Sequence, residues 1–150
     1  MVDELNRAGV EDQPVPHFDS TAWTPPARPL AESRVAIVTT AGLYVDGDDG
    51  WSRGDQSYRV LPAGELDVRL GHQSANFDRT GFLLDVNVAY PVDRLAEMRD
   101  DGAVGSLGPR NLSFMGAQSG TLETIRLDSG PAAAAQLRED GVDVVLLTPV

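Results

Sequence analysis

The clearest pattern in the chain is an apolar run of β-branched and aliphatic residues near its C-terminus. Residues 142–147 read Val-Asp-Val-Val-Leu-Leu and follow a helix-forming stretch, residues 131–140, which starts at Pro131 and ends before Gly141. Proline is favoured in the first turn of a helix and glycine just past its end. The order helix, glycine and apolar strand is the αβ step of a parallel sheet, so this region predicts an α/β fold.

Other stretches carry the apolar or alternating pattern of strands. Residues 34–40 are an apolar, β-branched run that predicts a second buried strand, and residues 66–70 alternate as a half-buried strand does. Residues 103–107 predict a further short strand, and residues 83–90 are interpreted as an extended segment or a loop. Residues 46–58 predict a loop because aspartate and glycine dominate them.

A second helix is predicted at residues 91–102. Pro91 suits its first turn, three apolar residues recur on one face, and Gly102 is a good C-terminal stop. With the strands above, the fold class is α/β, an open parallel, Rossmann-like sheet of about four or five strands with flanking helices. The last strand should be buried on both faces, yet no helix-forming stretch follows it in these 150 residues.

The first 33 residues differ from the rest of the chain. They hold five prolines, scattered charges and no helical or strand period. We interpret residues 1–33 as an extended, Pro-rich arm that lies on the domain surface or on a partner subunit, with Phe18 and Trp23 as its anchors. The α/β domain then occupies residues 34–150.

Composition removes several classes of function. The 150 residues include 12 arginines and 23 acidic residues, a formal net charge of −11, with no lysine and no cysteine. Lack of cysteine excludes a disulfide framework, a zinc ribbon, an iron–sulfur site and a thiol nucleophile within these residues. Lack of lysine excludes Schiff-base chemistry and a Walker phosphate loop. The acidity argues against a nucleic-acid partner, and with no signal peptide and no membrane-length apolar stretch we expect a cytoplasmic protein.

Candidate binding residues follow the strand at residues 34–40. Thr39, Thr40 and Gly42 stand at its carboxyl end, where open α/β sheets bind ligands, although a plain strand exit explains them equally well. His72 is one of two histidines, and it either lines a site or is an ordinary surface or core residue. The acidic loop 46–50 fails the EF-hand pattern, because glycine and serine stand where ligands belong, so no metal site is expected.

Three more positions carry chemistry together with a purely structural alternative. Asp85 and Asn87 would share one face of an extended segment, and Asp93 falls in a first helical turn, where it favours the dipole or caps amides. Ser113 and Gly116 would put a hydroxyl and a close backbone approach in a loop, or simply pack in the core.

Several segments taken together resemble the selenoprotein B family of glycine, sarcosine, betaine and D-proline reductases. The resemblance runs from about residue 29 to residue 150 and fits the short, stand-alone relatives. It is carried, in this order along the chain, by residues 34–43, 54–59, 85–95, 102–107, 113–116 and 140–149.

The resemblance implies reductive cleavage of a carbon–nitrogen bond in an amino acid or betaine. In the family, the Thr148-Pro149 segment leads into a selenocysteine or cysteine that attacks the α-carbon, with a pyruvoyl group on a partner chain in the systems that use one. A thiol-based reductant then restores the site. We therefore expect the sequence to stop just before its redox residue, to hold no cofactor of its own, and to lack activity as written.

The resemblance also implies where a small amine or amino-acid substrate would bind. Arg94 is the best candidate for a substrate carboxylate, because its planar fork suits that group, and its alternative is an ion pair on a helix surface. The expected partners are a reductant or another reductase subunit, in a homo-oligomer or a hetero-complex. The alternative function is a non-catalytic α/β binding or scaffold subunit. The expected pocket residues are Thr39, Thr40, Gly42, His72, Asp85, Asn87, Asp93, Arg94, Ser113, Gly116, Thr148 and Pro149.

Overall fold

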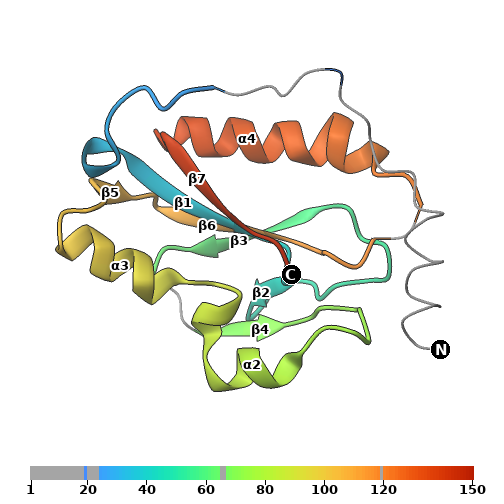
Figure 1. Cartoon of the computed structure of the whole chain (residues 1–150). Coiled ribbons are helices and arrows are strands. Elements are labelled where there is room, and N and C mark those ends of the chain that lie inside the picture. Colours follow the sequence, from blue (N-terminus) through green and yellow to red (C-terminus); the bar gives the residue numbers. More distant parts are fainter. Residues whose placement is uncertain (1–18, 20–23, 65–66, 119) are drawn as a thin grey trace.

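The computed structural model describes residues 19, 24–64, 67–118 and 120–150, so most of the expected arm, with Phe18 and Trp23, lies outside the described residues (Figure 1). Its strands are β1 (Arg34–Thr39), β2 (Leu43–Val45), β3 (Tyr58–Pro62), β4 (Val68–Leu70), β5 (Ser106–Leu107), β6 (Arg110–Phe114) and β7 (Val144–Thr148). Its α-helices are α2 (Arg79–Leu84), α3 (Val92–Asp100) and α4 (Gly130–Glu139). Shorter turns are η1 (Leu30–Glu32), η2 (Val86–Val88) and the π-helix η3 (Ile125–Ser129).

The main sheet has five strands, and β1 is its centre. Strand β7 runs parallel along one edge of β1, in a register that pairs Thr39 with Thr148, while β5 and β6 run parallel along the other edge. Strand β3 pairs antiparallel with β6. The α/β class and the strand number of the sequence prediction are therefore confirmed, but the sheet is mixed at its β3 edge rather than wholly parallel.

Helices cover both faces of this sheet, and each interface has its own core. Figure 1 shows α4 above the sheet and α2 and α3 below it. Val35 and Ile37 of β1 face the core that contains Leu95 of α3, and Ala36 faces the core that contains Leu137 of α4. This alternation explains why β1 reads as a continuous apolar run, since both of its faces are buried.

The predicted helix at residues 91–102 is α3, and the predicted helix and strand near the C-terminus are α4 and β7. The extended alternative for residues 83–90 is wrong, because they form the end of α2 and the turn η2, with irregular backbone around that turn. Asp78 accepts hydrogen bonds from the Thr80 and Gly81 amides at the start of α2, and Asp85 accepts one from the Asn87 amide. Two short-range caps thus make this stretch helical.

Two strand predictions need adjustment in partner or length. The strand at residues 66–70 is β4, and it pairs antiparallel with β2 in a separate two-stranded sheet. The strand at residues 103–107 shortens to β5, because Gly105 packs against the backbone of η1, where an added Cβ would lie 2.7 Å from the carbonyl carbon of Glu32. Strands β2, β3 and β6 were not predicted.

The acidic loop after β2 is organised by Arg59 of β3. Its guanidinium donates to the carbonyl of Asp49 at 3.0 Å and to the carboxylate of Asp55 at 3.0 Å, and it lies 4.3 Å from the Trp51 ring centre. Burial alone would raise the pKa of Asp55, but hydrogen bonds from Ser57 and Arg59 outweigh it and lower this pKa. The hydrogen bonds and the ring contact of Arg59 therefore stabilise the acidic loop.

Candidate functional site

The carboxyl ends of β1, β6 and β7 converge at one edge of the main sheet. The Thr40 amide donates to the Thr148 carbonyl at 3.2 Å, and the Gly116 amide donates to the Thr40 carbonyl at 2.8 Å. The Thr40 hydroxyl accepts from the Val150 amide at 2.9 Å. Pro149, which lies between Thr148 and Val150 in the sequence, is exposed. Ligands of open α/β sheets bind at this edge, so the strand ends form the first candidate site.

The hydroxyls of two threonines at this edge form hydrogen bonds that stabilise the fold. The Thr39 hydroxyl donates to the Ala89 carbonyl at 2.8 Å, and the Thr148 hydroxyl donates to the same carbonyl at 3.0 Å. Thr39 is fully buried and also accepts from the Ala41 amide at 3.2 Å. The pair ties β1 and β7 to the turn before α3, so both hydroxyls position the strand ends.

Two glycines let the backbone segments at the strand ends pack closely together. Gly42 has a φ of +64°, and a Cβ there would lie 2.8 Å from the Met115 methyl and 3.2 Å from the His72 backbone nitrogen. A Cβ on Gly116 would lie 2.9 Å from the carbonyl oxygens of Thr40 and Val150. Both glycines thus permit close backbone approach, the role that the sequence analysis considered for Gly116.

His72 lies on the loop between β4 and α2 and reaches the same strand ends. Only 5% of it is exposed, and its ring stacks on Phe77 with the centroids 4.5 Å apart. The Ser74 amide donates to Nδ1 at 3.2 Å, so the proton of the neutral ring lies on Nε2. Burial lowers the pKa of His72, and the charge of Arg79 lowers it further, which keeps the ring neutral.

A small cavity of about 210 Å³ adjoins this histidine. His72, Ser74, Asn76 and Phe77 line one side of it, and Gly116, Ala117 and Val150 line the other. None of these lining side chains is acidic. Sequence analysis singled out His72 and Gly116 here but missed the loop residues, whose only signal was a polar stretch between a strand and a helix.

The lowered pKa of His72 gives a testable pH dependence of stability. The unfolded chain binds a proton on this histidine near a pH of about 6.5, whereas the folded chain resists it. We therefore expect the free energy of unfolding to fall as the pH falls below about 6.5, with a slope of at most about 1.4 kcal/mol per pH unit. Urea unfolding at about pH 7.5 and about pH 5.5 should show a smaller loss in His72→Phe, which keeps His17. Equal losses in both proteins would contradict this.

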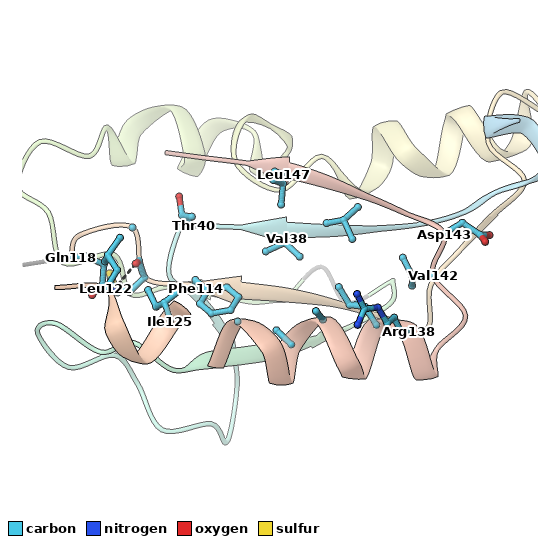
Figure 2. A pocket seen from close by; sticks show the side chains of 17 residues that line it. Val38, Thr40, Phe114, Gln118, Leu122, Ile125, Arg138, Val142, Asp143 and Leu147 are labelled. Atoms are coloured by element: carbon cyan, nitrogen blue, oxygen red, sulfur yellow. Dashed lines mark hydrogen bonds between the residues drawn. The ribbon is translucent and has the colours of Figure 1, made fainter. Parts of the chain in front are cut away.

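A larger apolar groove of about 700 Å³ lies on the other side of the strand ends, between α4 and the sheet. Figure 2 shows Val38 and Leu147 on the strands, with Thr40 and Gln118 at one end of the groove and Arg138 at the other. Leu147 is 68% exposed, and β7 pairs only with β1 among the described residues. Val145 and Leu147 of this edge strand line the groove, so β7 provides part of one wall.

Ser113 lies inside the sheet. Its hydroxyl accepts from the Leu43 amide at 2.7 Å, and the residue is fully buried, so it connects β2 to β6. This is the core-packing alternative of the sequence analysis. A contact between Ser113 and substrate stays a prediction.

Asp85, Asn87 and Asp93 form a separate cluster at the start of α3. The Asn87 side chain donates to Asp85 at 2.9 Å and to Asp93 at 3.0 Å, and its carbonyl accepts from the Asp93 amide at 3.1 Å. The side-chain and backbone hydrogen bonds from Asn87 lower the pKa of Asp85. The cluster caps the first turn of α3. Ala89, which follows η2, accepts from the Thr39 and Thr148 hydroxyls at the strand ends.

Arg94 lies on the outer surface of α3. Its Nη2 forms an ion pair with Glu97 at 2.9 Å, and its side chain is 60% exposed. This arrangement matches the ion-pair alternative. Binding of a substrate carboxylate by Arg94 stays a prediction, and His72 is better enclosed for that task.

No group of three or more His, Asp or Glu side chains in the described part of the chain is arranged to hold a metal ion. None of its helices is both long enough and apolar enough to cross a membrane.

Comparison with known proteins gives a consistent set of relatives. Residues 2–150 match the family described as glycine/sarcosine/betaine reductase selenoprotein B. The D-proline reductase subunit gamma of Acetoanaerobium sticklandii is 35% identical over 89% of this chain and 55% of its own length. The glycine reductase complex component B subunit gamma of Symbiobacterium thermophilum is 29% identical over 91% of this chain and 33% of its own length. The sarcosine reductase complex component B subunit beta of Peptoclostridium acidaminophilum is 26% identical over 99% of this chain and 35% of its own length.

The chain thus spans about half the length of the first of these relatives and about a third of the other two. No solved structure matches the chain significantly.

Proposed function

The chain belongs to the glycine/sarcosine/betaine reductase selenoprotein B family, and on that premise we propose that it is a subunit of a reductase complex that cleaves a carbon–nitrogen bond. The substrate is an amino acid or a betaine. The match of the family over residues 2–150 carries this proposal, because it includes every strand end of the candidate site. The names of the relatives, which are reductase subunits or components of reductase complexes, support a hetero-complex. We propose that this complex is located in the cytoplasm.

The nucleophile of this proposal is a selenol or thiol on the residue directly after Val150. A residue attached there would start beside Gly116 and His72, because Val150 is fixed to Thr40 and lines the same cavity. The surroundings suit an anionic selenolate or thiolate, since the cavity offers an N–H donor on His72 and no carboxylate side chain.

The proposed reaction needs electrons as well as a nucleophile. The selenolate or thiolate would attack the α-carbon and displace the amine, which leaves with the electron pair of the carbon–nitrogen bond. A thiolate of the reductant would then attack the selenium or sulfur, so that the α-carbon leaves and takes up a proton. A dithiol reductant would provide two electrons and two protons as it becomes a disulfide, which balances replacement of the carbon–nitrogen bond by a carbon–hydrogen bond and release of the amine. No cofactor is proposed within this chain, and a pyruvoyl group would belong to a partner chain.

The test begins with the gene and the native protein. We expect the codon after Val150 to encode selenocysteine or cysteine, and mass spectrometry of the native protein to find that residue. A chain that carries it, assembled with its partner subunits and a dithiol, should release amine from glycine, sarcosine, betaine or D-proline. The chain ending at Val150 is the matched control and should release none. A stop codon with no cysteine or selenocysteine encoded downstream, or an inactive complete complex, would overturn the proposal.

One observation favours a second candidate function, a non-catalytic α/β binding or scaffold subunit. The exposed Leu147 and the apolar groove beside α4 offer a surface on which another polypeptide could pack. A complex that assembles fully around the chain ending at Val150, and whose activity is unchanged by the residues that follow, would favour this function over the catalytic one.

A further inference from the structure

His72 presents a hydrogen-bond donor that the protein leaves unused. Its Nε2 is buried and has no hydrogen-bond partner in the described part of the chain. Nδ1 of the same ring accepts from the Ser74 amide, so moving the ring proton from Nε2 to Nδ1 would break that hydrogen bond. An unpaired buried N–H is unfavourable, which points to an acceptor supplied from outside.

The space in front of Nε2 is kept open by Gly116. A Cβ at this position would lie 3.1 Å from Nε2, so any larger residue would fill the place where an acceptor must sit. The cavity that adjoins both residues measures about 210 Å³. This is below the size of drug-binding pockets and admits only a small molecule.

The side-chain charges around this position favour an anion. The Arg79 guanidinium donates to the His72 carbonyl at 2.8 Å, and its positive charge acts on the His72 ring. Asp78, the acidic neighbour of Arg79, accepts from the Thr80 amide at the start of α2 instead. The opposite wall carries Gly116, Ala117 and Val150, whose side chains are not acidic, and Phe77 adds an apolar surface. The main-chain carboxylate of Val150 lies at this wall too, so the test below moves it away from the cavity.

We propose that His72 Nε2–H binds the carboxylate of a small zwitterionic amine in this cavity. The proposal rests on the proposed function for the class of substrate, but the contact itself is independent of catalysis. It assigns the carboxylate to a neutral, buried donor rather than to Arg94, which pairs with Glu97 on the surface of α3. The apolar wall at Phe77 then faces the methylene or methyl groups of the ligand.

The test follows the imidazole directly by NMR on ¹⁵N-histidine-labelled protein. The free chain should show the neutral Nε2–H form of His72, and betaine, glycine and acetate should each shift Nε2 to saturation. Tetramethylammonium, which has the methyl groups but no carboxylate, should leave Nε2 unmoved. The same titration on a chain extended past Val150 by two glycines moves the terminal carboxylate away from the cavity and should give the same result.

Two variants separate the donor from the shape of the ring. His72→Phe keeps an aromatic ring against Phe77 but removes the donor, and it should bind betaine at least about tenfold more weakly. His72→Gln retains an N–H donor and should recover most of the affinity, while thermal unfolding confirms that both variants fold. The proposal is overturned if no carboxylate shifts Nε2 in the unmodified protein, if tetramethylammonium shifts it equally, or if folded His72→Phe binds betaine normally.

The two proposals fail separately. A reductase complex that is active while betaine leaves Nε2 unmoved would overturn only the role of His72. Carboxylate binding at His72 in a complex that releases no amine would overturn only the proposed reaction.

Discussion

Replacing Asn111 with alanine should lower the free energy of unfolding by about 2–4 kcal/mol. Asn111 is buried in β6, where its side-chain carbonyl accepts from the Ile37 amide at 2.8 Å and its amide donates to the Tyr90 hydroxyl at 2.8 Å. The variant removes the acceptor of a buried backbone amide in the central strand and leaves a cavity between β6 and the turn before α3. Both the lost acceptor and the cavity lower the free energy of unfolding, and water does not reach the buried Ile37 amide to replace the acceptor.

Urea unfolding measures this loss, and two variants calibrate it. Tyr90→Phe keeps the ring but removes the hydroxyl that accepts from the Asn111 amide, so it should cost about 1 kcal/mol. Asn76→Ala makes the same substitution at an exposed position and should change the free energy of unfolding by less than about 0.5 kcal/mol. An Asn111→Ala protein as stable as Asn76→Ala would mean that the Ile37 amide has another acceptor.

The same residue shows why sequence patterns found β1 and β7 but missed β6. Strands β1 and β7 are continuous apolar runs, a local signal that requires no knowledge of the rest of the fold. Strand β6 reads Arg-Asn-Leu-Ser-Phe, in which polar residues alternate irregularly with apolar ones. Asn111 and Ser113 are buried there only because each accepts from a backbone amide of another strand, at Ile37 and Leu43. That pairing is tertiary, so no window of sequence contains it.

The residues of the candidate site could likewise be predicted from the sequence only in part. Thr40, Gly116 and Thr148 meet at one sheet edge, as the general rule for open α/β sheets indicates. The cluster of Asp85, Asn87 and Asp93 lies apart, because Asp85 and Asn87 belong to the capped turn η2 rather than to an extended segment, and Asp93 lies in the first turn of α3, as its sequence position predicts. His72 could be suspected from its residue type, but its free Nε2 depends on a bond to Ser74 and on the glycine opposite.

The left-handed conformation of Gly42 leads to the second large effect. Gly42→Ala should lower the free energy of unfolding by about 2–4 kcal/mol, because the backbone cost of a positive φ and a steric clash act together. The φ of +64° alone disfavours any residue with a Cβ. The new methyl would also lie 2.8 Å from Met115 and 3.2 Å from the His72 backbone, and the backbone cannot swing aside as the Met115 side chain can.

Gly102→Ala separates these two causes, since Gly102 has a similar φ of +75° and no atom within 4 Å of the new methyl. It should cost only about 1–2 kcal/mol in the same urea unfolding experiment, the contribution of conformation alone. The excess in Gly42→Ala then measures how tightly the connection between β1 and β2 packs against the His72 loop. Because that packing presses on the His72 backbone, Gly42→Ala should also weaken betaine binding, whereas Gly102→Ala should not. Equal losses of stability in the two variants would mean that the His72 loop yields to the added methyl, and that the cavity is less firmly shaped than its close contacts imply.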